Sequence, residues 1–254
     1  MNSYKSLFRL FFTFSVLLLF SSASFAQGEI DDQVKIFFRN ERTYAFHLNS
    51  NGYGVNFRYA KWIDGFRWRI YHIDLCEIKH DKEIKISNDH LSNTGRFVFG
   101  KKNNFYNLRA GIGFQKEVFS KRDKGGIAIR YYYSGGTSLG ILKPIYYEVF
   151  DQFGPGATIE KKFDTSLQPH HIVGKAPYLR GFNEISLTPG AFVKAGVSFE
   201  YSKKEEKMKA LEAGVIIDAF LLEYEILVIA KNPQVLVTLF VNYRWGKIID
   251  KRTH

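Results

Sequence analysis

Two adjacent histidines, His170 and His171, come closest in this chain to a catalytic or metal-binding group. Asp164, Thr165 and Ser166 precede them, so one polar stretch carries imidazole, carboxylate and hydroxyl groups. A metal site needs a third or fourth ligand at a recognisable spacing, and none follows. No Ser-His-Asp order or G-x-S-x-G pattern stands out elsewhere. We therefore keep His170 and His171 as loop candidates for chemistry and predict neither a metal nor a cofactor.

A second set of chemically capable residues consists of charged side chains on the polar parity of alternating segments. In the interior of a small closed barrel, such charges would pair as a network of ion pairs and hydrogen bonds, because an unpaired buried charge is costly. The alternative is a narrow selectivity zone or a proton-linked path. The predicted network residues are Arg58, Arg109, Arg130, Lys194, Arg244, Glu184, Glu200, Glu212 and Asp218, with Arg67 and Arg69 assigned to the same side.

Alternation of apolar and polar residues defines the elements that must position these groups. In residues 184–201, Leu187 and Val193 share one parity while Lys194 and Glu200 share the other. A period of two predicts a β-strand with one apolar and one polar face. Similar alternation recurs in seven further segments, so we predict an all-β chain. These segments are 43–48, 53–60, 66–78, 105–119, 127–150, 209–221 and 235–245.

Two of these segments are irregular. In 66–78 the apolar parity shifts between Ile70 and Ile73, which predicts a β-bulge near His72 and places Trp68 on the outer face. In 127–150, Gly135-Gly136 either lies within one long strand that projects beyond the membrane or forms a hairpin. The first possibility gives eight strands in total, and the second gives ten.

The N-terminus has the pattern of an export signal. Lys5 and Arg9 precede an uncharged run over residues 10–20, and Ala26 completes a small-x-small cleavage pattern. We predict a cleaved signal peptide over residues 1–26. The alternative is a retained N-terminal membrane helix, because the uncharged stretch is close to the ~17 residues that can span a bilayer.

Export and alternation together predict a closed antiparallel up-and-down β-barrel in an outer membrane, with apolar side chains outward and polar ones inward. Residues 27–254 are expected to form this single domain, most simply with eight strands. Long connections near 81–104, 151–181 and 222–233 alternate with tight turns. Such alternation is typical of barrels whose long loops face outside and whose short turns face the periplasm.

Net charge limits the expected classes of partner, and the cysteine content limits the possible disulfides. The formal net charge is +11, and Cys76 is the single cysteine, which excludes an intrachain disulfide framework. A basic exported protein attracts anionic headgroups, so we expect outer-membrane lipids and lipopolysaccharide as partners. We do not expect nucleic acid, and a protein partner is not defined by the sequence.

Five segments together carry a family resemblance: Tyr59-Ala60-Lys61 through Gly65-Phe66-Arg67, Gly113-Phe114-Gln115-Lys116, Arg130 to Gly136, Leu142 to Tyr147 and Leu239 to Lys247. They resemble a Bacteroidota-type outer-membrane β-barrel family. The resemblance implies the barrel fold and carries over no functional residues, because proteins of this family are generally described without assigned chemistry.

We predict a structural or binding role through the surface loops rather than enzymatic activity. The alternatives are an enzyme that modifies outer-membrane lipid and an accessory component of a secretion or assembly machine.

Overall fold

The computed structural model describes most of the chain beyond the predicted signal peptide. The described ranges are 39–88, 95–121, 126–150, 158–165, 167–204, 206–230 and 232–250. All of them belong to one compact unit, residues 34–254. The predicted signal peptide and Ser166 lie outside the described residues. Within the part of the chain that the structure describes, no helix is long and apolar enough to cross a bilayer.

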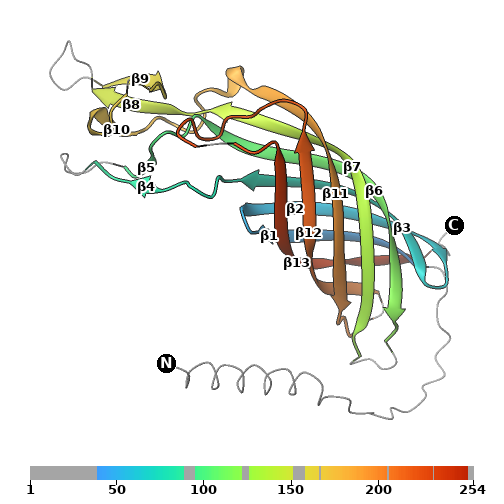
Figure 1. Ribbon diagram of the computed structural model, residues 1–254. Coiled ribbons are helices and arrows are strands. Elements are labelled where there is room, and N and C mark those ends of the chain that lie inside the picture. Colours follow the sequence, from blue (N-terminus) through green and yellow to red (C-terminus); the bar gives the residue numbers. More distant parts are fainter. Residues whose placement is uncertain are drawn as a thin grey trace, which may run out of the picture. The chain divides into compact units, whose positions relative to one another are not determined.

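Eight antiparallel strands close into a barrel (Figure 1). Each strand pairs with the previous and the next barrel strand along the chain, and β1 pairs with β13 to close the sheet. The prediction of an eight-stranded up-and-down barrel is therefore confirmed. The barrel strands are β1 (Arg39–Asn49), β2 (Gly52–Asp64), β3 (Arg67–Ile78), β6 (Asn103–Phe119), β7 (Ala128–Pro144), β11 (Ser186–Glu200), β12 (Lys207–Phe220) and β13 (Val235–Asp250).

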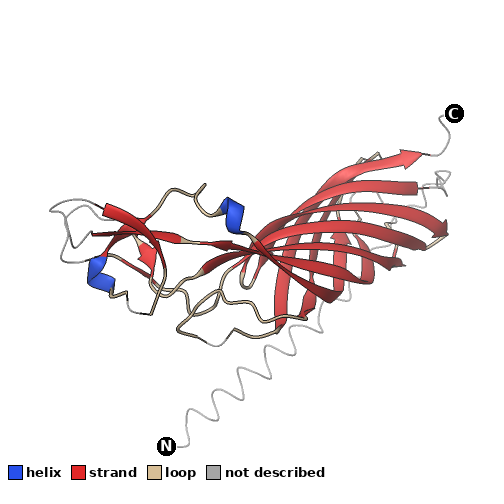
Figure 2. Ribbon diagram, turned by 90° about the horizontal axis from the view of Figure 1, so that it is seen from above, coloured by secondary structure: helices blue, strands red, loops and turns tan. Residues whose placement is uncertain are grey.

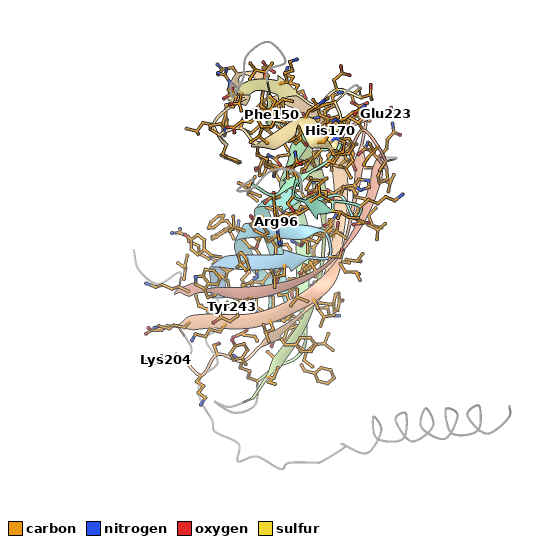
Figure 3. The ribbon with its side chains drawn as sticks, turned by 90° about the vertical axis from the view of Figure 1, so that its left-hand side faces the viewer. Arg96, Phe150, His170, Lys204, Glu223 and Tyr243 are labelled. Carbon is orange, nitrogen blue, oxygen red and sulfur yellow. The ribbon has the colours of Figure 1, made fainter. Side chains whose placement is uncertain are left out.

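The long connections carry small elements of their own at one end of the barrel, and we call these elements together the platform (Figures 1 and 2). Figure 3 places Phe150 and His170 in the platform and Lys204 at the opposite, tight-turn end. The predicted loops 81–104 and 151–181 thus contain regular structure. The platform comprises a hairpin of β4 (Lys85–Ile86) and β5 (Phe97–Val98), a sheet of β8 (Tyr146–Phe150), β9 (Thr158–Lys162) and β10 (Ile172–Lys175), and the 3-10 helices η1 (Pro169–His171) and η2 (Phe182–Glu184).

The barrel wall has its apolar face outside. Charged side chains such as Arg109, Asp218 and Arg244 are completely buried in the interior, beside clusters of aromatic residues. Alternation along each strand fixes this segregation, because successive side chains point to opposite faces of a sheet. Exposed apolar side chains on the outer wall include Tyr44, Phe46, Leu48, Val55, Ile73, Leu75, Ile112, Tyr133, Leu187, Val193, Leu211, Ile217, Val237, Leu239 and Trp245.

The bulge predicted near His72 is wrong. β3 keeps one parity throughout, so Trp68, Ile70, His72 and Asp74 all face the interior. The irregularity lies instead beside the turn, where the β2–β3 register shifts between Trp62 and Asp64. The error has a physical cause: the interior is partly apolar there, so an apolar residue did not mark the outer face. Its consequence is that Arg67 and Arg69 point outward and do not join the interior charges.

The ten-strand alternative is also excluded. β7 runs through Gly135-Gly136 and pairs without interruption with β11 on one side. On its other side Gly136 lies opposite Gly111, and a Cβ on Gly136 would stand 2.6 Å from the Gly111 Cα atom. Beyond Pro144 the chain continues as β8 into the platform. The glycines therefore permit close approach of two strands rather than a hairpin.

Candidate functional site

The centre of the interior is organised around Glu212 on β12. Arg244 donates to its carboxylate from Nε at 2.7 Å and from Nη2 at 3.0 Å, and Arg58 Nη1 donates at 2.8 Å. The Tyr132 hydroxyl and the Asn242 amide donate to Oε2 at 3.2 and 3.0 Å. The Arg58 guanidinium also lies 4.3 Å from the centroid of the Tyr132 ring. Two arginines on one carboxylate leave an excess positive charge, which carboxylates elsewhere in the interior balance.

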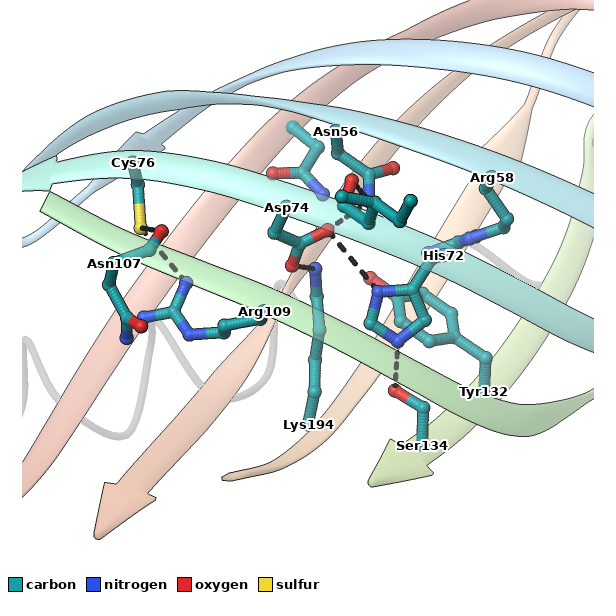
Figure 4. Close-up of polar contacts among 12 residues, drawn as sticks. Asn56, Arg58, His72, Asp74, Cys76, Asn107, Arg109, Tyr132, Ser134 and Lys194 are labelled. Carbon is teal, nitrogen blue, oxygen red and sulfur yellow. Dashed lines mark hydrogen bonds and ion pairs between the residues drawn. The ribbon is translucent and has the colours of Figure 1, made fainter. Parts of the chain in front are cut away.

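Asp74 on β3 is the centre of a second group (Figure 4). Its Oδ2 lies 2.8 Å from Lys194 Nζ, and its Oδ1 lies 3.2 Å from His72 Nδ1. Asn56 donates to the same carboxylate. The other ring nitrogen of His72 lies 3.0 Å from Ser134 Oγ on β7. One buried polar chain therefore runs from lysine through carboxylate and imidazole to a serine hydroxyl.

A third group lies nearer the platform end of the interior. Arg109 binds Asp218 through two hydrogen bonds, from Nε to Oδ1 and from Nη2 to Oδ2, each 2.7 Å long. Asn107 donates to the same Oδ1 at 3.0 Å. Arg109 Nη1 lies 3.0 Å from Cys76 Sγ (Figure 4). Bidentate pairing fixes both the position and the plane of the guanidinium.

The tight-turn end is closed by a fourth group. Arg130 contacts three carboxylates, those of Glu41 at 2.8 Å, Glu117 at 2.9 Å and Glu200 at 2.8 Å. Lys121 adds a second cation to Glu200 at 2.7 Å. The negative excess of this group offsets the positive excess around Glu212.

The interior is close to neutral overall. Five cations and five carboxylates inside the barrel are each at most 4% exposed among the described residues. Because every one of these charges has an opposite partner within 3 Å, the arrangement fills space and holds the strands together, and it presents no ring of one sign to a passing ion. The ten residues are Arg58, Arg109, Arg130, Lys194, Arg244, Glu41, Asp74, Glu200, Glu212 and Asp218.

Of the residues proposed from the sequence as network members, Glu184 is misplaced, as are the outward-pointing Arg67 and Arg69. Glu184 lies in η2, outside the barrel, where it pairs with Lys162 and accepts a hydrogen bond of 2.8 Å from the Tyr146 hydroxyl. Its alternation continued that of β11, but β11 begins only at Ser186. The other proposed members all lie in the groups described above. Sequence reasoning missed His72 and Asp74, which a single unshifted parity in β3 would have placed inside.

The chain Asp74–His72–Ser134 has the distances of a nucleophile, a base and an orienting carboxylate. Its surroundings are those of a packed interior. Lys194 holds the far oxygen of Asp74, and the Phe192 ring packs edge-on against His72 with 5.6 Å between ring centroids. Ser134 is only 7% exposed. A hydroxyl enclosed in this way orders the interior but does not meet a bulky substrate without displacement of its neighbours.

The loop candidates His170 and His171 stand side by side in η1, with their ring centroids 4.2 Å apart. The Asn88 amide donates to the carbonyl oxygens of His170 and Ile172 at 2.9 and 3.0 Å, which fixes this turn on the platform. Among the described residues, no three His, Cys, Asp or Glu side chains are grouped so as to hold a metal ion. Within the described ranges, the structure thus groups no further metal-binding side chains with the two histidines.

Aromatic and basic side chains meet where the platform joins the barrel wall, and we call this group the upper rim. The Tyr106 and Tyr178 hydroxyls lie 2.6 Å apart, and Lys143 Nζ lies 4.3 Å from the Tyr178 ring centroid. Lys79 Nζ lies 5.4 Å from the ring centroid of Tyr53. Rings that are half apolar and half wet, accompanied by lysines, are typical of side chains at a membrane interface.

These features define a closed, antiparallel, eight-stranded up-and-down β-barrel with an ionic interior and an apolar outer wall. No protein-family model matches the chain, and no curated protein matches it. The resemblance to a Bacteroidota-type family therefore stays a prediction.

Solved structures of bacterial barrels are similar to this chain over most of its length. Ail, the attachment invasion locus protein of Yersinia pestis, aligns with 6% identity and a TM-score of 0.40, covering 84% of this chain and 99% of its own. Neisserial surface protein A aligns with 12% identity and a TM-score of 0.34, covering 84% and 96%. The N-terminal β-barrel domain of Pseudomonas aeruginosa OprF aligns with 12% identity and a TM-score of 0.36, covering 82% and 98%. Similarities of this size say nothing about a shared task.

Proposed function

We propose that this protein is an integral outer-membrane β-barrel with a side-chain-filled interior, which holds the platform at the cell surface for a structural or binding role. The observation that carries the proposal is the arrangement of the barrel wall, which is inverted relative to that of a soluble protein. Fully buried charges such as Glu212 and Arg244 lie inside, while large apolar side chains on every barrel strand point outward. A water-exposed wall of this kind would exceed by far the apolar patch that soluble monomers tolerate. Lipid is the solvent that suits it.

The loop lengths support one orientation. Tight connections at Asp64 to Arg67, Phe119 to Ala128 and Glu200 to Lys207 lie at one end, and the platform lies at the other. Outer-membrane barrels place their short turns in the periplasm and their long loops outside. The upper rim then lies at the outer leaflet, where the exposed Lys79 is available to lipopolysaccharide phosphates, whereas Lys143 is buried against aromatic rings.

The paired interior supports a barrel that does not conduct. Eight strands enclose a space that side chains fill. Glu212, Asp74 and Asp218 each bind at least one cation at 2.8 Å or less. Moving ions through the barrel would require several of these contacts to break together.

The platform supports a role outside the membrane because it has a core of its own. Tyr147 is completely buried there, and its hydroxyl lies 2.7 Å from the carbonyl oxygens of Val98 and Lys101. This contact ties the β8 sheet to the hairpin of the preceding loop. A loop region with its own packed core presents a fixed surface, which favours binding over a merely flexible linker. The core consists of Phe97, Ile145, Tyr147, Val149, Phe163 and Ile172.

Membrane fractionation, gel mobility and planar-bilayer recording test this proposal. We expect the chain in the outer-membrane fraction, with a faster-migrating folded band that shifts on boiling. We also expect no stable conductance from the refolded barrel. Recovery in the soluble periplasmic fraction would contradict membrane embedding, and reproducible ion channels would contradict the filled interior.

One alternative has a specific observation in its favour. The distances in Asp74–His72–Ser134 suit acyl transfer, so an enzyme that acts on outer-membrane lipid is the second candidate. The enclosure of Ser134 argues against it, and covalent labelling of this serine decides between the two.

A further inference from the structure

A groove of about 460 Å³ lies in the outer wall of the barrel, across β2, β3, β6 and β7; we call it the outer groove. Large side chains line its sides, with Tyr59 and Tyr71 at one end and Ile73 near the other. Its floor is made by small residues. The lining residues are Phe57, Tyr59, Tyr71, His72, Ile73, Ala110, Gly111, Ile112, Gly135, Gly136 and Thr137.

The groove exists because small residues, Gly135 and Ala110, stand in two successive outward rows. One row runs through Tyr71, Ile112 and Gly135, and the next runs through Ile73, Ala110 and Thr137. Packing inside the barrel does not require glycine at 135. A Cβ there would stand 3.4 Å from the Phe192 carbonyl oxygen, an ordinary contact distance. The missing side chain at Gly135 is thus a feature of the lipid-facing surface, whereas Gly111 and Gly136 in the lining are needed for close packing within the barrel.

Basic side chains adjoin the tyrosine end of the groove. Lys61 pairs in register with Arg69 in the outward row directly below Tyr59 and Tyr71, and Lys116 follows in the next row. All three are exposed, and no described carboxylate forms an ion pair with them. Arg69 lies over the Phe114 ring, 5.5 Å from its centroid, which holds the guanidinium against the wall. An apolar groove that opens at one end onto three cations matches an anionic amphiphile.

The orientation of the barrel indicates from which membrane leaflet a lipid would enter the groove. The three cations lie next to the Asp64 to Arg67 turn, at the tight-turn end, which the proposed function places in the periplasm. The groove extends from there toward the middle of the wall. Lipid that enters it head-down therefore comes from the periplasmic leaflet, where phospholipids reside, and not from the outer leaflet.

We propose that the outer groove binds an anionic phospholipid of the periplasmic leaflet, with an acyl chain between Tyr71 and Thr137 and the phosphate at Lys61, Arg69 and Lys116. This inference rests on the proposed membrane embedding. A second copy of the chain is a poorer occupant, because a two-fold contact through this face would bring the same three cations together. Repulsion between like charges in a medium of low dielectric constant opposes such a contact.

Native mass spectrometry of the full-length barrel, with phosphatidylglycerol as the probe, tests the site. Gly135→Leu fills the groove and leaves the charges, and a triple Lys61→Gln, Arg69→Gln, Lys116→Gln variant removes the charges and leaves the groove. We expect each to weaken phosphatidylglycerol binding about tenfold or more: Gly135→Leu because it fills the space for the acyl chain, and the triple variant because it removes interfacial cations that attract anionic lipid. Phosphatidylethanolamine should bind the wild type more weakly than phosphatidylglycerol does.

Matched controls lie on the opposite wall. Ala213→Leu adds the same outward side chain on β12, and Lys207→Gln, Lys209→Gln, Lys247→Gln removes three exposed cations at the same end of the barrel. We expect both to bind phosphatidylglycerol as the wild type does. Equal losses in the test and control variants, or unchanged binding in Gly135→Leu, would overturn the inference. Displacement of phosphatidylglycerol by lipopolysaccharide in the wild type and not in Gly135→Leu would also overturn it, in favour of an outer-leaflet ligand.

Heat-dependent gel mobility of every variant distinguishes failure of the lipid site from failure of the proposed membrane embedding. Variants that insert and shift on boiling but bind lipid like the wild type contradict the lipid site and leave the proposed function standing. Failure of the wild type to insert into bilayers would contradict both the lipid site and the proposed function.

Discussion

Arg244 on β13 and Glu212 on β12 are joined by two charge-assisted hydrogen bonds inside the barrel, and both side chains are shielded from solvent. Arg58, which is 154 residues distant from Glu212 in sequence, completes the contact from β2. The carboxylate is therefore held by two arginines from separate parts of the barrel wall. We therefore expect the loss of Glu212 to destabilise the barrel strongly.

Replacing Glu212 by alanine should lower the free energy of unfolding by about 3–5 kcal/mol, because removal of one partner leaves buried charge without compensation. Urea titration of the barrel in lipid vesicles, followed by tryptophan fluorescence, measures the change. Glu206→Ala is the matched control, since Glu206 is exposed in the turn before β12, and its loss should change stability by at most about 0.5 kcal/mol. Similar losses for both variants would show that the interior carboxylate has no special role.

Ser134 should not react with a fluorophosphonate probe in the folded barrel, because Phe192, His72 and the strand wall enclose its hydroxyl. Ser134→Ala should lower stability by about 1–3 kcal/mol, since the facing His72 nitrogen loses its partner. It should leave the lipid profile of the cell unchanged. Labelling of the wild type that disappears in Ser134→Ala would instead favour the lipid-modifying enzyme.

Tyr147→Phe should loosen the platform and spare the barrel. Burial raises the pKa of the Tyr147 hydroxyl, so the group stays protonated and remains a donor to Val98 and Lys101 throughout the neutral range. Because the folded-state pKa exceeds the unfolded one, this contribution is complete below pH 10.0 and is lost as the pH rises through the folded-state value. The variant leaves buried carbonyl groups without this donor, at a cost of about 1–3 kcal/mol.

Amide hydrogen exchange measures this effect. Exchange should accelerate in residues 97–101 and 146–150 and stay unchanged in β11 to β13. Tyr146→Phe is the control, because its hydroxyl donates to the exposed Glu184 and lies outside the platform core. Faster exchange spread evenly over barrel and platform would contradict an independent platform core.

Glu184 should titrate below its ordinary pKa of 4.5, because Lys162 first and the Tyr146 hydroxyl second stabilise its charged form. A lowered folded-state pKa means that the contribution is present above the unfolded value and is lost as the pH falls through the folded one. Carboxylate NMR in lipid nanodiscs measures the titration. Lys162→Gln should return the pKa toward 4.5, and Tyr146→Phe should do so by less. An unchanged value in Lys162→Gln would contradict the ion pair.

Much of the barrel was predictable because alternation is a local property. The pattern over 184–201 located β11 to within two residues at its start, and those over 209–221 and 235–245 located β12 and β13. Which residues of β3 face inward was not predictable, because Trp68 and Ile70 face an interior that is apolar at their level. The strands β4, β5, β9 and β10 fall in predicted loops, and β8 falls at the end of the predicted strand 127–150, since these strands are short and pair across long connections.

The sequence by itself determined which side chains share a face, because a strand turns its residues alternately to two sides. It thereby determined an apolar outer wall, a charged interior and the end at which the long loops lie. Only the tertiary structure decided which interior groups meet. The approach of Arg58 to Glu212, and of Ser134 to His72, depends on strand register and on the stagger with which the barrel closes. These are relations between distant strands, and no local pattern of residues encodes them.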